Sequence, residues 1–254
     1  MGDRAFGYHD NGADLVRIDA GAVIPLKSPT PNVIGLGTDA TEPDRLRLAG
    51  ADGSLWESTE AGASFSPLDP APVAPLTYRF AFDPRDLDHI LFGSASIGAW
   101  VSFDGGKQWT QATGLSPSGK ANAFEVVVSP IDSNVVWSQG IDLDENLPNA
   151  PNGGRHIFRS EDGGKTFLRV VDHEPGVVTL TNGVLMAPSP GDANVMYFVF
   201  GTYYGDYGTD LFRYDAGTKQ LTKTHNAYDD VSSIAFSPAA PGLLYLGLTQ
   251  EQIL

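Results

Sequence analysis

The sequence predicts an all-β fold, a β-propeller of about five to six four-stranded antiparallel blades, and three observations support this prediction. A polar, glycine-containing turn recurs along the 254 residues, a proline-containing hairpin pattern alternates with it, and no segment shows the periodicity of an amphipathic helix. Repeats of roughly 40 to 60 residues indicate an array of similar units, and radially repeated four-stranded sheets form propellers.

The recurrent turn has the pattern Ser-x-Asp-x-Gly-x-x-aromatic. It occurs at 102–109 (SFDGGKQW) and 160–167 (SEDGGKTF), and 58–65 (STEAGASF) carries glutamate in place of aspartate. Weaker copies around Asp19 and Asp215 keep only the acid and a following glycine. We expect the acid to accept hydrogen bonds from backbone N–H groups of its own turn, and the glycine to adopt a positive φ. The structural residues predicted for the three good copies are Ser58, Glu60, Gly62, Phe65, Ser102, Asp104, Gly106, Trp109, Ser160, Asp162, Gly164 and Phe167.

The alternating pattern consists of two β-branched or aromatic runs on either side of a turn, which predicts a strand–turn–strand hairpin. Clear copies span 81–93, 126–140, 185–201 and 234–248, and a looser copy spans 34–50. Each unit therefore has four strands, A to D: a hairpin of A and B, a loop, strand C ending in the polar turn, and strand D.

The polar turn resembles the Asp-box, or BNR repeat, found in sialidases, xyloglucan-cleaving hydrolases, sortilin-type receptor domains and photosystem assembly factors. This resemblance covers nearly the whole chain. It implies a propeller whose turns between strands C and D lie at the outer edge of each blade. It also implies that the B–C and D–A connections lie together on the opposite face, here called the loop face, where function is expected. Asp-box propellers are mostly exported, so the resemblance implies an extracytoplasmic location.

The domain prediction is a single propeller over 1–254 that begins and ends within blades. Residues 5–21 parallel 198–216, and 247–254 parallel 93–100, so strands B and C are supplied twice. Either the last hairpin pairs with the first strands and closes the propeller, or the chain is part of a longer propeller; the duplicated strands favour the second reading. Unpaired edges in an open propeller would favour self-association.

Composition restricts the partners. The net charge is −15, and nucleic acid and anionic membranes both require a basic surface, so neither is expected as a partner. The absence of cysteine excludes disulfides and thiolate metal sites. No apolar run is long enough for a transmembrane helix, and residues 1–12 lack a signal-peptide core.

The first long B–C connection, 138–155, carries several acids. Asp142, Asp144 and Asn146 begin like a calcium loop, but the following residues lack the glycine and the final glutamate of an EF-hand, which excludes that motif. A looser calcium site, a solvated acidic loop and a carboxylate pair for glycoside hydrolysis remain as interpretations. Arg155 and His156 follow directly and are candidate ligand-binding residues.

The second long B–C connection, 201–210, is rich in tyrosine. Aromatic rings next to carboxylates suit a carbohydrate surface, because rings stack on sugars and carboxylates accept their hydroxyl protons. The alternative is that these tyrosines pack the loop onto its own blade. The corresponding position near the N-terminus holds a tyrosine and a histidine. The candidate binding residues are Tyr203, Tyr204, Asp206, Tyr207, Tyr8 and His9.

The function predicted from these features is a non-catalytic binding or scaffold propeller that recognises a glycan or a protein on the loop face. The alternative is a glycoside hydrolase with acids drawn from Asp142, Asp144, Glu174 and Asp230.

Sialidases use an arginine triad and a tyrosine nucleophile, and the Arg-Ile-Pro motif that usually opens that family is absent here. Xyloglucan hydrolases use two aspartates in a cleft between two propellers, and this chain is too short for two. No cofactor is expected, apart from calcium at the acidic loop.

Overall fold

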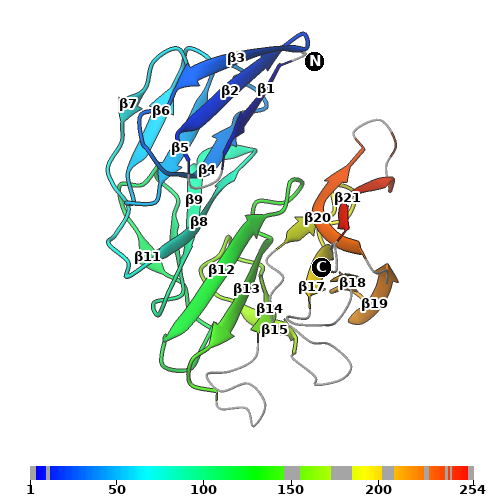
Figure 1. Ribbon diagram of the computed structural model, residues 1–254. Helices are drawn as coiled ribbons and strands as arrows, with labels where there is room; N and C mark the ends of the chain where they lie inside the picture. The colour runs from blue at the N-terminus through cyan, green and yellow to red at the C-terminus, as the bar shows by residue number, and fades with distance from the viewer. Residues whose placement is uncertain are drawn as a thin grey trace.

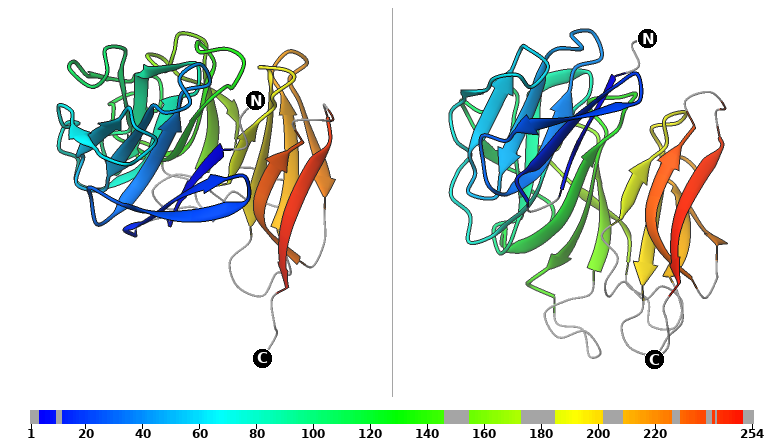
Figure 2. Two further views of the ribbon diagram at one scale, coloured as in Figure 1. Left: turned by 90° about the horizontal axis from the view of Figure 1, so that it is seen from above. Right: turned by 45° about the horizontal axis from the view of Figure 1, so that its top comes forward.

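The computed structural model describes residues 4–9, 12–145, 155–172, 185–201, 209–225, 229–237, 240 and 242–250. All regular elements among these residues are β-strands, and they form six sheets that follow one another around an arc (Figures 1 and 2). The all-β propeller prediction is confirmed. No helix able to cross a membrane occurs in the described part of the chain.

Four of the sheets have four strands, and each is an antiparallel meander that follows chain order. The first of them contains β4 (Val33–Thr38), β5 (Leu46–Gly50), β6 (Leu55–Ser58) and β7 (Ser66–Pro67). The next contains β8 (Thr77–Asp83), β9 (Asp86–Ser94), β10 (Ala99–Ser102) and β11 (Thr110–Gln111). The third contains β12 (Ala121–Val128), β13 (Val136–Asp142), β14 (Arg155–Ser160) and β15 (Leu168–Val171). The fourth contains β16 (Met186–Pro188), β17 (Val195–Gly201), β18 (Thr209–Asp215) and β19 (Gln220–His225).

The two outer sheets are smaller. The first sheet of the chain has β1 (Arg4–Tyr8), β2 (Asp14–Asp19) and β3 (Ala22–Lys27), and the last has β20 (Asp229–Phe236) and β21 (Leu244–Gln250). Within the described residues, no backbone pairing joins β1 to β20 or β21. The A strands β4, β8, β12, β16 and β20 contact one another in succession and form the inner wall of the arc.

The core lies between neighbouring sheets. Alternate side chains of each strand point to opposite faces of its sheet, so every sheet can pack against the sheet on either side. Phe80 and Phe92 of one sheet pack with Ile34 of the preceding sheet, and Leu91 packs with Phe158 of the following sheet. Burying one such side chain contributes about 1.5–3 kcal/mol. Apolar packing between adjacent sheets therefore holds the arc together.

The polar turns join the C and D strands, as predicted. In the turn after β10, the Asp104 carboxylate accepts hydrogen bonds from the Ser102 hydroxyl (2.8 Å) and the Gln108 N–H (2.9 Å). The Ser102 oxygen in turn accepts a hydrogen bond from the Gly106 N–H (2.9 Å). Gly106 has a φ of 97°, which glycine adopts at low cost. The turn is thus closed by hydrogen bonds to its own side chains.

The turn after β14 repeats this geometry and also ties two sheets together. The Ser160 oxygen accepts from the Gly164 N–H (2.9 Å), and Asp162 accepts from the Ser160 hydroxyl (2.7 Å). The Thr113 N–H, just after β11, donates to the Lys165 carbonyl (2.9 Å), and the Phe167 N–H donates back to the Thr113 carbonyl (2.9 Å). Neighbouring sheets are thus joined by backbone hydrogen bonds as well as by apolar packing.

Candidate functional site

The register of the strands shows which loops meet on the loop face. Asp142, at the end of β13, pairs with Ala121 at the start of β12, and Ile141 pairs with Arg155 at the start of β14. The polar turns lie at the opposite ends of these strands, on what we call the turn face. The sequence-predicted residues of the acidic loop therefore share the loop face with the first residues of the A strands.

A β-bulge changes the direction of side chains at the loop-face end of the A strands. The pairing register shifts at the same position in β4, β8, β12 and β20, leaving Ile34, Tyr78, Phe124 and Ser232 as the respective extra residues. Bulges of this kind often re-aim side chains beside functional sites. The sequence pattern did not predict these bulges.

Two of the bulged residues form an aromatic pair on the loop face. The rings of Tyr78 and Phe124 are 5.0 Å apart between centroids, and the Arg155 guanidinium lies 4.4 Å from the Phe124 ring centroid. Burial lowers the pKa of Arg155 from its ordinary value. Arg155 thus lies on the loop face, as expected, and stacks on an aromatic residue that the sequence did not single out.

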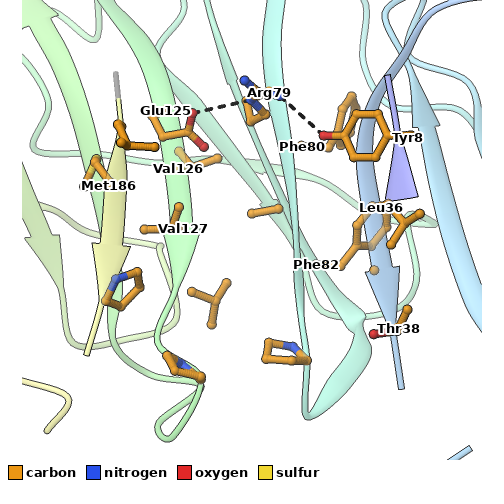
Figure 3. A pocket seen from close by; sticks show the side chains of 17 residues that line it. Tyr8, Leu36, Thr38, Arg79, Phe80, Phe82, Glu125, Val126, Val127 and Met186 are labelled. Carbon is orange, nitrogen blue, oxygen red and sulfur yellow. Dashed lines mark hydrogen bonds and ion pairs between the residues drawn. The ribbon is translucent and has the colours of Figure 1, made fainter. Parts of the chain in front are cut away.

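Tyr8, one of the predicted binding residues, lies next to an ion pair at the inner wall of the arc. Nε of Arg79, in β8, lies 3.4 Å from the Glu125 carboxylate in β12, and another guanidinium N–H of Arg79 donates to the Tyr8 hydroxyl at 3.3 Å (Figure 3). Tyr8 is therefore directed towards the inner wall, whereas His9 closes the turn after β1, with its N–H donating to the Asp14 carbonyl (2.9 Å). Glu125 was missed, although it is the only charged residue in the run ANAFEVVV.

The buried His156 lies at the centre of a cluster of charged residues, here called the His156 cluster. Its Nε2 lies 2.6 Å from the Glu145 carboxylate and its Nδ1 lies 3.3 Å from the Asp172 carboxylate. Arg169 bridges the same acids, at 3.3 Å from Glu145 and 3.5 Å from Asp172, and contacts Asp142 at 3.2 Å. Burial lowers the pKa of His156, and Arg169 acts in the same direction, against the opposite effect of the two acids. The cluster joins the end of β13 to the ends of β14 and β15.

The carboxylates of Asp142 and Asp144 both have partners within the protein. Asp144 accepts hydrogen bonds from the Ser118 hydroxyl (2.8 Å) and the Ser118 N–H (2.7 Å), and these bonds lower the pKa of Asp144. Asp142 accepts from the Asp144 N–H (2.9 Å) in addition to its contact with Arg169. The two acids thus lie in the B–C connection after β13, and Asp144 ties it to the D–A connection before β12.

Several predicted site residues lie outside the described residues: Asn146, Glu174, Tyr203, Tyr204, Asp206 and Tyr207. Asp230 lies in β20, where only its backbone is described. Among the described side chains, no group of three or more histidine and acidic residues has an arrangement that could hold a metal ion.

Comparison with known proteins finds relatives of two kinds, and no family model matches the sequence. The chain is 51% identical over 256 residues to the dispase autolysis-inducing protein of Streptomyces mobaraensis, a match that covers 99% of this chain and 68% of that protein. It is 26% identical over 251 residues to a xyloglucanase of a Paenibacillus species, covering 86% of this chain and 23% of that enzyme.

Solved structures show the same architecture. The GH74 xyloglucanase of Xanthomonas campestris matches with a TM-score of 0.68 at 18% identity, over 99% of this chain and 41% of that one. A chain of the COPII outer coat vertex matches with a TM-score of 0.67 at 14% identity, over 100% of this chain and 68% of that one. At such low identities these structures show the propeller fold alone. The chain spans less than half the length of the xyloglucanases that it matches.

Proposed function

This chain belongs to the family of the dispase autolysis-inducing protein, and on that premise we propose that it is a non-catalytic propeller that binds a protein partner on its loop face and promotes the self-cleavage of dispase or a similar enzyme. The observation that carries the proposal is the sequence identity to that relative along nearly the whole chain. We also propose an extracytoplasmic location, as the resemblance to mostly exported propellers implies.

The loop face has the residue types that dominate protein interfaces. Val73 and Leu76, in the connection between β7 and β8, are 96% and 54% exposed. Tyr78, close to them in sequence, forms the aromatic pair with Phe124. Aromatic and arginine side chains contribute most of the binding energy in typical interfaces, and Arg155 stacks on this pair. The net charge of −15 would speed association with a partner that presents a basic surface.

The test is to incubate purified dispase with this protein and follow intact dispase over time on denaturing gels. We expect faster loss of dispase in its presence and a stable complex when dispase is inhibited. A Val73→Asp/Leu76→Asp variant should lose both effects. The matched control is Ile131→Asp/Leu168→Asp, which changes two exposed apolar residues near the turn face. Unchanged dispase lifetime and no complex with the parent protein would refute the proposal.

Glycoside hydrolysis is the second candidate, favoured by the likeness to xyloglucanases. A glycosidase general acid needs a raised pKa, however, and hydrogen bonds from Ser118 lower that of Asp144. The carboxylate of Asp142 is likewise engaged by Arg169, at 3.2 Å. These contacts support binding over catalysis for the two acids. Hydrolysis of xyloglucan or sialosides that is lost in folded Asp142→Asn and Asp144→Asn variants would establish the second candidate instead.

We also propose that the three good polar turns are Asp-box repeats. The support is a hydrogen bond from the glycine N–H to the serine oxygen in all three turns, with a serine-to-aspartate hydrogen bond in the two aspartate copies. On this proposal the turns are structural, and differences in function between related propellers arise on the loop face.

A further inference from the structure

The first sheet, β1 to β3, has an outer face that is apolar although no other sheet of the molecule covers it. Leu15 and Leu26 point the other way, into the core shared with the sheet containing β4. Successive side chains of a strand alternate between faces, so the residues between these two kinds of position lie on the outer face. They are Ala5, Gly7, Val16, Ile18, Val23 and Pro25, and the pairing of β2 with β1 and β3 places them side by side.

This outer face differs from the solvent face of an ordinary sheet. An antiparallel sheet with one wet face alternates apolar and polar residues along each strand. In β3, by contrast, Leu26 packs against the next sheet while Val23 and Pro25 are exposed, Val23 by 63%. Charge appears on this face only at its loop-face edge, where Asp14 pairs with Lys27. An exposed apolar patch of this kind marks an interaction surface.

The rest of the molecule shows what covers such a face. Five apolar clusters fill the five interfaces between the six sheets in the described part of the chain. In each interface, one sheet packs against the sheet that follows it along the arc. Two faces are left over at the ends of the arc (Figure 1): the outer face of the first sheet and the outer face of the last sheet.

The outer face of the last sheet, β20 and β21, is also uncharged at its centre. Ile234, Leu244 and Leu246 point inward, towards the sheet containing β17 and β18. The outer face carries the residues that alternate with them, Ser233, Ala235, Tyr245 and Gly247, and Tyr245 is 58% exposed. This face therefore presents one exposed ring beside small side chains, a surface on which the aliphatic side chains of the first sheet can pack.

Within one molecule these two faces do not cover each other, since Val23 and Tyr245 both remain more than half exposed. We propose that they pack together between molecules, with the first sheet of one copy against the last sheet of a second copy. This contact repeats the sheet-on-sheet packing of the five internal interfaces. It also joins the copies through faces that are uncharged at their centres, which matters because two chains of net charge −15 repel each other elsewhere.

The proposed contact is head-to-tail, because it joins two different surfaces. Each copy in a pair therefore keeps one outer face free to receive a further copy. The contact lies at the ends of the arc, and the inference does not rest on the proposed binding of dispase at the loop face.

The experiment is sedimentation velocity of the purified protein alone at a series of concentrations. We expect the average mass to rise above that of the monomer as the concentration rises. A first-sheet variant, Val16→Lys/Val23→Lys, and a last-sheet variant, Ala235→Lys/Tyr245→Lys, should each remain monomeric. The matched control, Ile131→Lys/Leu168→Lys, changes two exposed apolar residues near the turn face and should assemble as the parent does.

Mixing the two variants tests the head-to-tail geometry. The first-sheet variant keeps an intact last sheet and the last-sheet variant keeps an intact first sheet, so the mixture should form a dimer of one copy of each and nothing larger. Thermal melting shows whether each variant is folded. The single variants Val23→Lys and Tyr245→Lys, at side chains that are already more than half exposed, replace a double variant that melts below the parent.

A parent protein that stays monomeric at every concentration would overturn the proposal. Assembly of either folded variant alone, as strong as that of the parent, would overturn the assignment of these two faces. A mixture that stays monomeric while the parent assembles would overturn the head-to-tail contact. Since dispase is absent, none of these results bears on the proposed function.

Discussion

Nε2 of His89, in β9, lies 2.8 Å from the carbonyl oxygen of Gly163, in the polar turn of the next sheet. The other ring nitrogen, Nδ1, lies 3.1 Å from the carboxylate of Asp83. Burial alone would raise the pKa of Asp83, but hydrogen bonds from His89, Ser133 and the Arg85 N–H outweigh it and hold that pKa below its ordinary value of 3.8. His89 thus links two sheets through buried polar contacts on both sides of its ring.

Replacing His89 should destabilise the protein strongly. His89→Ala leaves the buried Asp83 carboxylate and the Gly163 carbonyl without their histidine partner, and leaving a buried polar group unsatisfied costs about 1–3 kcal/mol. Urea unfolding monitored by tryptophan fluorescence would measure the loss. The control is His9→Ala, since His9 is exposed, and it should change the free energy of unfolding by less than about 0.5 kcal/mol. Equal stability of the two variants would contradict the prediction.

The His156 cluster predicts a dependence of stability on mildly acidic pH. Because burial lowers the pKa of His156 below 6.5, the unfolded chain binds a proton more readily than the folded protein does. The free energy of unfolding should therefore fall as the pH drops through 6.5, by no more than about 1.4 kcal/mol per pH unit, and level off below the folded-state pKa.

Urea unfolding at a series of pH values between 5 and 8 or so would measure this slope. In His156→Gln the part of the slope due to this residue should disappear, whatever the absolute stability of the variant. Comparing slopes separates His156 from the other histidines, which both proteins share. A variant with the same slope as the parent would show that His156 does not titrate differently on unfolding.

The polar turns should contribute to stability through their buried serines. Ser160→Ala removes the acceptor for the Gly164 N–H, and an unsatisfied buried donor costs about 1–3 kcal/mol. The exposed Ser64 hydroxyl only donates to Glu60, so Ser64→Ala serves as the control with little expected effect. Melting temperatures from differential scanning calorimetry would distinguish the two. A Ser160→Ala protein that melts with the parent would argue against a structural role for the turn.

Calcium should have little effect on the described part of the acidic loop. Asp142 and Asp144 already bind Arg169 and Ser118, so we expect the melting temperature to be the same with calcium and with a chelator. Differential scanning fluorimetry under both conditions measures this directly. A melting temperature that rises with calcium and falls with Asp144→Asn would support the calcium site instead.

Local patterns were enough to predict the strands, the hairpins and the polar turns. The turn at Ser102, Asp104 and Gly106 is closed by residues at most a few positions apart, so its hydrogen bonds follow from sequence spacing. Each hairpin is likewise recognisable from two β-branched or aromatic runs on either side of a turn. These features account for the fold class, whereas the assignment of a loop face came from the resemblance to Asp-box propellers.

Contacts between sheets were not predictable in the same way. Arg79 and Glu125 belong to different blades, and their proximity depends on how β8 packs against β12. The extra residue at Phe124 also lies in a run that reads as an ordinary strand, because a bulge is decided by pairing with β13. A charged residue within an inner-strand run, as at Glu125, was nevertheless a signal that could have been used.

The backbone hydrogen bonds between Thr113 and the turn of the next sheet have a consequence for the whole protein. In a linear array each sheet is stabilised mainly by its two neighbours, and interface energies between neighbours determine how far an opening spreads. Amide protons on both sides of this junction should therefore exchange with solvent through one shared opening event. The sheets containing β8 and β12 would then behave as a single cooperative unit of unfolding, although each is a complete four-stranded sheet.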